Sequence, residues 1–439
     1  MSPACAPKRL VPASPRIRLA AVSAATAVFW SVVGCVPPSE PADSDSFVYN
    51  NATDPTNGGA SYVGSAACNA CHPDVAAEHR IHGHNHALTH VQGQPPGYAP
   101  EGTRAGVPQP PEGLTWNDIS YVISGYLHGA FFVDGDGFVA TDGVAGVNTQ
   151  WNLDFPANGT SAGFVEYLPD QTTPKPYDYE TCFRCHTTGP QPQDPTDPRS
   201  QDGRPGILGT WAEPDVQCEA CHGPGSSHVP DPQARNIFVD ATPQTCAMCH
   251  MDGDDPDVIP VSDGFLRSNT QYPQLLASGG HSSFSCTVCH DPHASITYDR
   301  ERGLRNDCTA CHANANMAFH EGAMYEMGDY TEQLDCQSCH MSLAALSASL
   351  APASLVGPDA RVGDVRAHIF RINTQDADAS AMFTADGTAV RKDRQGRAAV
   401  TVDFVCLRCH NEAGNVFPLT LPGALLIADG MHARVTVCE

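Results

Sequence analysis

One short motif, C-x-x-C-H, occurs eight times in this chain of 439 residues. In each copy the two cysteines lie one helical turn apart, so both thiols can attach to the vinyl groups of one haem, and the histidine that follows can bind the iron as proximal ligand. The expected thioether cysteines are Cys68, Cys71, Cys182, Cys185, Cys218, Cys221, Cys246, Cys249, Cys286, Cys289, Cys308, Cys311, Cys336, Cys339, Cys406 and Cys409. The expected proximal histidines are His72, His186, His222, His250, His290, His312, His340 and His410. The sequence therefore predicts eight covalently bound haem c groups.

A zinc site is the alternative interpretation of any single pair of cysteines at this spacing. Here a histidine follows every one of the eight pairs, although the whole chain holds only 20 histidines. This regularity favours haem over zinc. The motifs use sixteen of the 19 cysteines and leave Cys5, Cys35 and Cys438.

The N-terminus has the pattern of an export signal. Four basic residues precede an apolar run over residues 19–33. This run is shorter than the roughly 20 residues that a transmembrane helix needs. The run ends in the letters VVGC, which resemble a bacterial lipobox with Cys35 as the lipidated residue. We interpret residues 1–34 as a lipoprotein signal peptide whose removal takes Cys5 with it; an ordinary cleaved signal is the alternative. The predicted location is a bacterial membrane, on its periplasmic or cell-surface face.

The chain that remains is strongly acidic. Loss of the signal removes four basic residues, so 20 Lys and Arg stand against 49 Asp and Glu, a formal charge of −29. Such a surface repels nucleic acid and anionic lipid and favours partners with a basic docking face, although acidity also serves solubility. Residues 35–61 are rich in Pro, Ser, Asp and Asn without apolar periodicity, which predicts a flexible tether.

Residues 62–439 form the predicted octahaem domain. Between consecutive motifs lie 17 to 35 residues, except for two longer insertions at about 91–180 and 341–405. With 38 Gly and 37 Pro, the chain offers a thin apolar core for its length, and buried porphyrins would supply the rest. We therefore expect a multihaem cytochrome c fold, mainly short α-helices and irregular loops packed around covalently bound haems, with small β-hairpin insertions.

Local patterns predict six elements within this domain. Helices are expected at 73–80, from a capping box at Thr115 and Asp118 through Tyr126, and over 417–432. A hairpin turning at 134–137, an extended stretch at 368–373 and a second hairpin over 381–404 complete the set. The acidic turn at 134–137 lacks the full spacing of a calcium loop. Cys438 is either inert in a frayed tail or forms an intermolecular disulfide.

Haem iron either takes a sixth ligand or stays open to substrate, and this choice separates electron carriers from enzymes. Twelve histidines lie outside the motifs. His293 follows His290 by three residues, so it is tethered to the proximal side of its own haem and should ligate a neighbouring one. His228 and His281 lie similarly close to motifs. Such cross-ligation would interlock successive haems and keep their porphyrins near contact for electron tunnelling.

Several segments resemble the multihaem cytochromes related to hydroxylamine oxidoreductase and its tetrahaem electron acceptor. They are YVGSAACNACH, HGHNHAL, CFRCHTTG, GTWAEPDVQCEACHGPGSSHV, CTVCHDPH, GDVRAHIFRI and DFVCLRCH. The resemblance covers most of residues 61–432, and CHGPGSxHV is its fairly specific part. It implies that the distal ligands are His84, His228, His281, His293, His320, His368 and His432. It leaves the eighth iron unassigned among His79, His86, His90 and His128.

From these features we expect an exported electron-transfer cytochrome with mostly bis-histidine haems and no catalytic residue. Its expected partners are other redox proteins, such as cytochromes or a membrane quinol-linked complex, and the membrane through the lipid anchor, but no nucleic acid. One alternative is an octahaem oxidoreductase that acts on a nitrogen or sulfur oxyanion at one open haem. A second is a subunit of a conductive cytochrome filament, which a lipid anchor disfavours.

The enzyme alternative has a further sequence test. Enzymes of the resembling family usually mark their catalytic haem with a lysine ligand or with a tyrosine cross-linked to the porphyrin. After signal removal only Lys175 and Lys392 remain, and Lys175 is the better candidate because it lies shortly before the second motif. Tyr177 and Tyr179 lie in the same stretch, so a tyrosine cross-link stays open.

Overall fold

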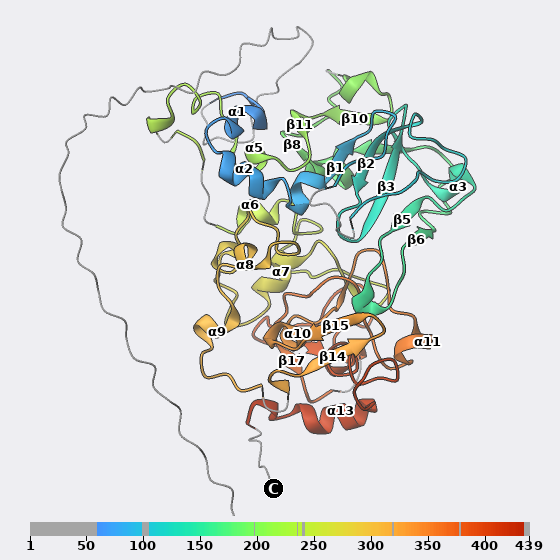
Figure 1. The fold of residues 1–439 in the computed structure, drawn as a ribbon, viewed down its shortest axis with the longest axis vertical. Helices are drawn as coiled ribbons and strands as arrows, with labels where there is room; N and C mark the ends of the chain where they lie inside the picture. Colours follow the sequence, from blue (N-terminus) through green and yellow to red (C-terminus); the bar gives the residue numbers. More distant parts are fainter. Residues whose placement is uncertain are drawn as a thin grey trace, which may run out of the picture.

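The computed structural model describes residues 59–98, 105–196, 198–234, 236–238, 242–317, 320–376 and 379–433. The predicted signal peptide, most of the tether, Cys35 and Cys438 lie outside these residues. The first motif, on α1, lies near one end of the long axis, and α13 lies at the opposite end (Figure 1). None of the helices in the described segments is long and apolar enough to cross a membrane.

Short helices carry or flank the motifs. The α-helices are α1 Ser65–Asn69, α2 Pro73–His79, α3 Asp142–Ala145, α4 Arg184–His186, α5 Cys218–His222, α6 Gln244–Ala247, α7 Gln271–Leu276, α8 Arg300–Gly303, α9 Cys308–Cys311, α10 Cys336–His340, α11 Ala353–Val356, α12 Val402–Val405 and α13 Leu421–Ala428. Single turns of other helix types are η2 Gly83–His86, η3 Pro156–Asn158, η4 Tyr179–Phe183, η5 Gln201–Gly203, η6 Pro232–Ala234, η7 Cys286–Val288, η9 Ala379–Ala381 and η10 Met431–Ala433. The helices predicted at 73–80 and in 417–432 are confirmed by α2 and α13.

A nine-stranded sheet forms one flank of the molecule (Figure 1). Its strands are β1 Leu88–His90, β2 Ile119–Ser124, β3 Gly129–Asp134, β4 Phe138–Val139, β5 Gln150–Asn152, β6 Gly163–Val165, β7 Lys175–Asp178, β9 Gln191–Pro192 and β10 Ile207–Thr210. The main path runs β1-β2-β3-β4-β7-β10-β9, and β5 joins β6 to β3. The expected fold class is thus correct in its short helices, but its β-structure is more extensive than small hairpins.

Four smaller sheets brace the rest of the chain. Three of them have two strands each: β8 Thr187–Thr188 with β11 Glu213–Pro214, β14 Met324–Met327 with β15 Tyr330–Gln333, and β17 Ile372–Asn373 with β18 Val400–Thr401. The fourth has three strands, β12 Val261–Ser262, β13 Phe265–Arg267 and β16 Ala345–Leu346. The extended stretch predicted at 368–373 becomes a regular strand only in β17. The hairpin predicted over 381–404 is reduced to a bridge between Phe383 and Val390, because β18 pairs in parallel with β17 instead.

The helix predicted from Thr115 through Tyr126 is wrong. Asp118 accepts hydrogen bonds from the backbone N–H and hydroxyl of Thr115, but these bonds close a turn. The next residues, ISYVIS, are mostly β-branched or aromatic and form β2 between β1 and β3. The hairpin predicted at 134–137 is confirmed, since Val133 pairs with Val139 across that turn.

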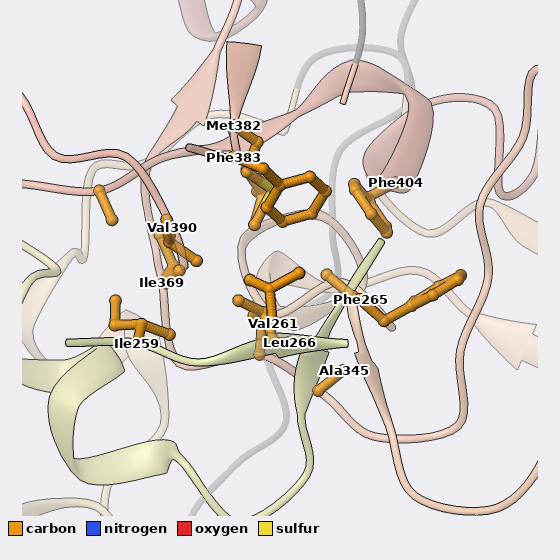
Figure 2. Packing of buried hydrophobic residues seen from close by; sticks show 14 of the residues in the cluster. Ile259, Val261, Phe265, Leu266, Ala345, Ile369, Met382, Phe383, Val390 and Phe404 are labelled. Atoms are coloured by element: carbon orange, nitrogen blue, oxygen red, sulfur yellow. The ribbon is translucent and has the colours of Figure 1, made fainter. Parts of the chain in front are cut away.

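The apolar core consists of separate clusters, three of which pack against motif cysteines. One cluster gathers Phe265, Phe383 and Phe404 around the β12-β13-β16 sheet (Figure 2). Cys339 and Cys406 pack against this cluster. Another gathers aromatic side chains of the large sheet, including Tyr177 and Trp211, around Cys182. The large sheet therefore holds the second motif in place, and the cluster around the β12-β13-β16 sheet holds the last two motifs.

Candidate haem array

Six of the eight motif histidines face a histidine from another segment of the chain. Two imidazoles bound to opposite sides of one metal, each through a bond of about 2 Å, leave ring centroids roughly 6 Å apart. The observed centroids lie between 5.6 and 6.2 Å apart. The facing pairs are His250 with His84, His222 with His293, His312 with His281, His290 with His368, His410 with His320, and His340 with His432.

Every facing pair joins two different motifs. His293 lies just after the fifth motif, yet its ring is nearly parallel to that of His222 in the third, at an interplanar angle of 4°. His84 follows the first motif and meets His250 of the fourth. This arrangement is what the tethering of His293 to its own motif predicts.

Hydrogen bonds orient the motif imidazoles. An acceptor beside Nδ1 holds the proton there and leaves Nε2 available for a metal. In five motif histidines Nδ1 lies 2.7–3.0 Å from such an acceptor. The pairs are His186 with Ala87 O (2.8 Å), His222 with Phe238 O (2.9 Å), His250 with Gln271 Oε1 (3.0 Å), His340 with Phe370 O (2.7 Å) and His410 with Phe417 O (2.9 Å). In the pair of His340 and His432 the two Nε2 atoms face each other at 3.4 Å.

Burial keeps several of these imidazoles neutral. Desolvation lowers the pKa of His368 to about 3 and that of His84 well below its usual value, and nearby histidines add to both effects. Neutral imidazole is the form that binds iron. Both of these rings are therefore in the neutral form that ligation requires.

A continuous cavity of about 3250 Å³ is lined by five of the six facing pairs, all except that of His222 and His293. It is bordered by both cysteines of six motifs and by Cys221 of the third. The cysteines, the facing imidazoles and this space together fit covalently attached haems, whose iron would supply reversible one-electron chemistry.

Neighbouring cysteines define the order of the motifs in space. Interactions between thiols connect the motifs in the spatial order first, third, fourth, fifth, sixth, seventh and eighth, and the second motif branches from the fourth. Three pairs of thiols lie within hydrogen-bonding reach: Cys68 with Cys218, Cys246 with Cys286, and Cys185 with Cys249. In four further pairs the thiols are close enough for an electrostatic interaction: Cys221 with Cys246, Cys289 with Cys311, Cys308 with Cys336, and Cys339 with Cys406. Haems on these cysteines would form one connected chain along the molecule.

His228 lies beside the first motif, but its ring is not brought against that of His72. Ser61 N–H donates to the Ser226 hydroxyl, and Glu219 accepts from the backbone of Val63 and Gly64, which lead into α1. The turn that carries His228 is therefore tied to the segment preceding Cys68. This position leaves His228 as the candidate partner for the iron on His72.

The ring of His186, in the second motif, faces no histidine among the described residues. The four histidines left unassigned by the sequence lie elsewhere: His79 contacts Val216 O, His86 stacks on Tyr126, His90 lies by Tyr121, and His128 lies 3.7 Å from Asp364. The structure therefore brings none of the four to His186.

Lys175, Tyr177 and Tyr179, which precede the second motif, lie in three different environments. The Lys175 ammonium lies 3.8 Å from an oxygen of Asp178 and 3.4 Å from the Thr181 hydroxyl. Tyr177 is fully buried in the aromatic cluster, whereas Tyr179 borders the cavity. Of the three candidates that sequence suggested for marking a catalytic haem, Tyr179 is the one that reaches the cavity.

An acidic group lies on the proximal side of the second motif. Ala87 O accepts from His186 Nδ1, and the next amide, that of Leu88, donates to Asp215 at 2.7 Å. Burial raises the pKa of Asp215 to about 7, although the backbone amides of Leu88 and Ala87 oppose the rise. The charge near the second motif therefore changes around neutral pH. Sequence patterns gave no signal for Asp215.

Comparisons with known proteins agree with the haem motifs. A family model described as cytochrome c554 and c-prime matches residues 167–223, which contain the second and third motifs. Over this part of the chain, the match agrees with the resemblance to multihaem c-type cytochromes that the motifs indicated. A search of curated proteins finds no match.

Three solved structures are similar to this chain. The outer cell wall cytochrome OcwA shows 18% identity and a TM-score of 0.44, with 75% of this chain and 82% of that chain covered. The octahaem sulfite reductase MccA of Wolinella succinogenes shows 15% identity and a TM-score of 0.48, with 78% and 64% covered. An undecahaem S-layer cytochrome of Carboxydothermus ferrireducens shows 16% identity and a TM-score of 0.37, with 71% and 52% covered.

Proposed function

We propose that this multihaem c-type cytochrome carries electrons along eight covalently bound haems, seven of them ligated by two histidines. The observation that supports the proposal most is the set of six facing imidazole pairs, each linking two motifs. Six-coordinate iron has no position for substrate, so such haems exchange electrons only. His228 completes the seventh pair with His72.

The connected order of the motifs supports a relay. Haems attached at these neighbouring cysteines would each lie next to another, from the first motif at one end to the eighth at the other. The ligands that cross between motifs fix these positions, because a shift of one segment would displace the ligand of another haem. A rigid array of neighbouring haems is suited to transfer without a moving carrier.

The haem on His186 supports a second candidate function. Since no described histidine faces His186, this iron is proposed to be open to a small ligand. An octahaem oxidoreductase that acts on a nitrogen or sulfur oxyanion would use such a site. The pairing of Lys175 with Asp178 argues against a lysine ligand there, whereas Tyr179 borders the cavity.

Turnover distinguishes the relay from the enzyme. The reduced protein is mixed in turn with nitrite, hydroxylamine and tetrathionate, and haem reoxidation is followed over successive additions. The relay predicts full, rapid reoxidation by a redox mediator but no sustained turnover of these substrates. Continued turnover with any of them at about 1 per second or faster would establish the enzyme instead. Binding of cyanide to a single haem is expected in either case.

We also propose that residues 1–34 are removed, that Cys35 is lipidated, and that 35–61 tether the octahaem domain of 62–439 to a membrane. The VVGC sequence and the polar composition of the tether support this proposal. Cys35→Ala should release the protein from the membrane fraction into the soluble fraction, as judged by haem staining. Equal retention of Cys35→Ala and wild type would contradict lipid anchoring.

A further inference from the structure

An exposed apolar face lies at the end of the haem array formed by the eighth motif. The side chains of Phe417 and Met324 are 65% and 46% exposed, and Leu426 on α13 is 79% exposed. Both α13 and β14 lie at this end of the molecule (Figure 1). Large apolar side chains exposed together in this way commonly mark an interaction site.

Hydrogen bonds hold Phe417 and Met324 on one surface. Asn415 N–H donates to Glu326 O at 3.0 Å, Glu326 N–H donates to the Asn415 side chain at 3.0 Å, and the Asn415 amide donates to Met324 O at 3.4 Å. The segment before α13 is therefore fixed alongside β14.

Phe417 also contacts the proximal ligand of the eighth haem. His410 Nδ1 donates to Phe417 O at 2.9 Å, and the two ring centroids lie 4.8 Å apart. Because the Phe417 side chain is largely exposed, one residue separates this iron ligand from solvent. An electron can therefore leave the array here over a short distance.

The two chain segments that meet near Phe417 lack lysine and arginine. Residues 313–333 and 411–433, which supply His320, β14, Phe417 and α13, contain neither. They do contain exposed acids: Glu321, Glu326, Asp329, Glu412 and Asp429. We call Met324, Phe417 and these five acids the terminal face. An acidic rim of this kind repels a second copy of this acidic chain and an anionic lipid surface, and it attracts a cation-rich protein.

We propose that the terminal face docks a small basic electron-transfer protein, which exchanges electrons with the haem on His410. Phe417 and Met324 form the apolar centre of the interface, and the acidic rim steers the partner's basic face onto it. This inference rests on the proposed relay function and names the partner class for one end of it. In each encounter one electron passes from ferrous haem to the partner's ferric haem, and no other reactant is needed.

The test measures how fast the fully reduced protein reduces mitochondrial cytochrome c, a small basic cytochrome, by stopped flow. The triple variant Glu321→Gln, Glu326→Gln, Glu412→Gln is compared with wild type and with the matched control Glu112→Gln, Glu166→Gln, Asp170→Asn, whose exposed acids lie on the large-sheet side. We expect the terminal-face variant to be roughly tenfold slower at low ionic strength. The difference in rate between the terminal-face variant and wild type should disappear above about 0.1 M salt, where ions screen charges that lie more than about 10 Å apart.

Oxidation by ferricyanide separates this inference from the relay itself. Ferricyanide is small and anionic, so the terminal-face variant should react with it no more slowly than wild type. Slow oxidation of wild type by both acceptors would contradict the relay. Normal ferricyanide rates together with equal cytochrome c rates in the two triple variants would overturn the docking site alone. A wild-type dimer in sedimentation that dissociates in Phe417→Ser would also overturn it, by showing that a second copy occupies the face.

Discussion

Replacing His293 with alanine should convert the haem of the third motif from low spin to high spin without releasing it. The ring of His293 lies parallel to that of His222 at 6.1 Å, and its Nδ1 is held by Asp291 at 3.1 Å, so Nε2 is directed to the metal. The thioether bonds of Cys218 and Cys221 keep the haem attached when the distal ligand is lost. The high-spin fraction of the ferric protein should therefore rise from one haem in eight to two.

His90→Ala provides the matched control for His293→Ala. His90 is exposed on β1 and lies by Tyr121, away from any motif histidine, so its loss should leave the spin state unchanged. Added imidazole should restore the low-spin signal of His293→Ala by entering the vacated position. An unchanged spectrum in His293→Ala would show that this side chain does not ligate iron.

Glu332→Gln should lower the free energy of unfolding by about 3–5 kcal/mol, because it leaves a buried arginine without its anion. The Arg408 side chain is 1% exposed and pairs with Glu332, which also accepts from Arg366 at 3.2 Å. Burial opposes ionisation of Glu332, but the hydrogen bond and charge of Arg408 outweigh it and lower the pKa to about 2. A charged Glu332 thus braces the seventh and eighth motifs.

The pH dependence of this effect has a definite sign. The pKa of Glu332 is depressed in the folded state, so its stabilisation is complete above the ordinary value of 4.5 and is lost as the pH falls towards 2. Urea unfolding followed by circular dichroism should therefore show a large gap between wild type and Glu332→Gln at pH 7 and a smaller one near pH 3. Glu326→Gln, on the exposed side of β14, should change stability by less than about 0.5 kcal/mol. Equal losses in the two variants at pH 7 would contradict the role of the buried pair.

Covalent chemistry explains why so much of the haem array can be read from sequence. Thioether attachment needs two cysteines and a histidine at a fixed local spacing, so each motif is visible without knowledge of the fold. That His293 should face a motif other than its own could also be reasoned locally, because three residues cannot carry it around its own haem. The identity of its partner, His222, depends on how distant segments pack and is visible only in three dimensions.

The failures of sequence reasoning have a common physical origin in tertiary context. The turn at Thr115 satisfies the local rule for a helix start, but pairing with β1 and β3 stabilises ISYVIS as a strand. The resemblance left the eighth iron unassigned among His79, His86, His90 and His128. In the structure His79 and His86 contact backbone carbonyls instead, and His186 is left without a facing ring.

Quantifying the spin states of the ferric protein, per haem and per polypeptide, is the most direct test of the proposed haem array. We expect eight haems for each chain, seven in low-spin bis-histidine sites and one high-spin haem at His186. An electron paramagnetic resonance spectrum integrated against total haem would give this ratio. A protein with eight low-spin haems would contradict the open site at His186, and one with half or more of its haems in high-spin form would contradict the bis-histidine relay.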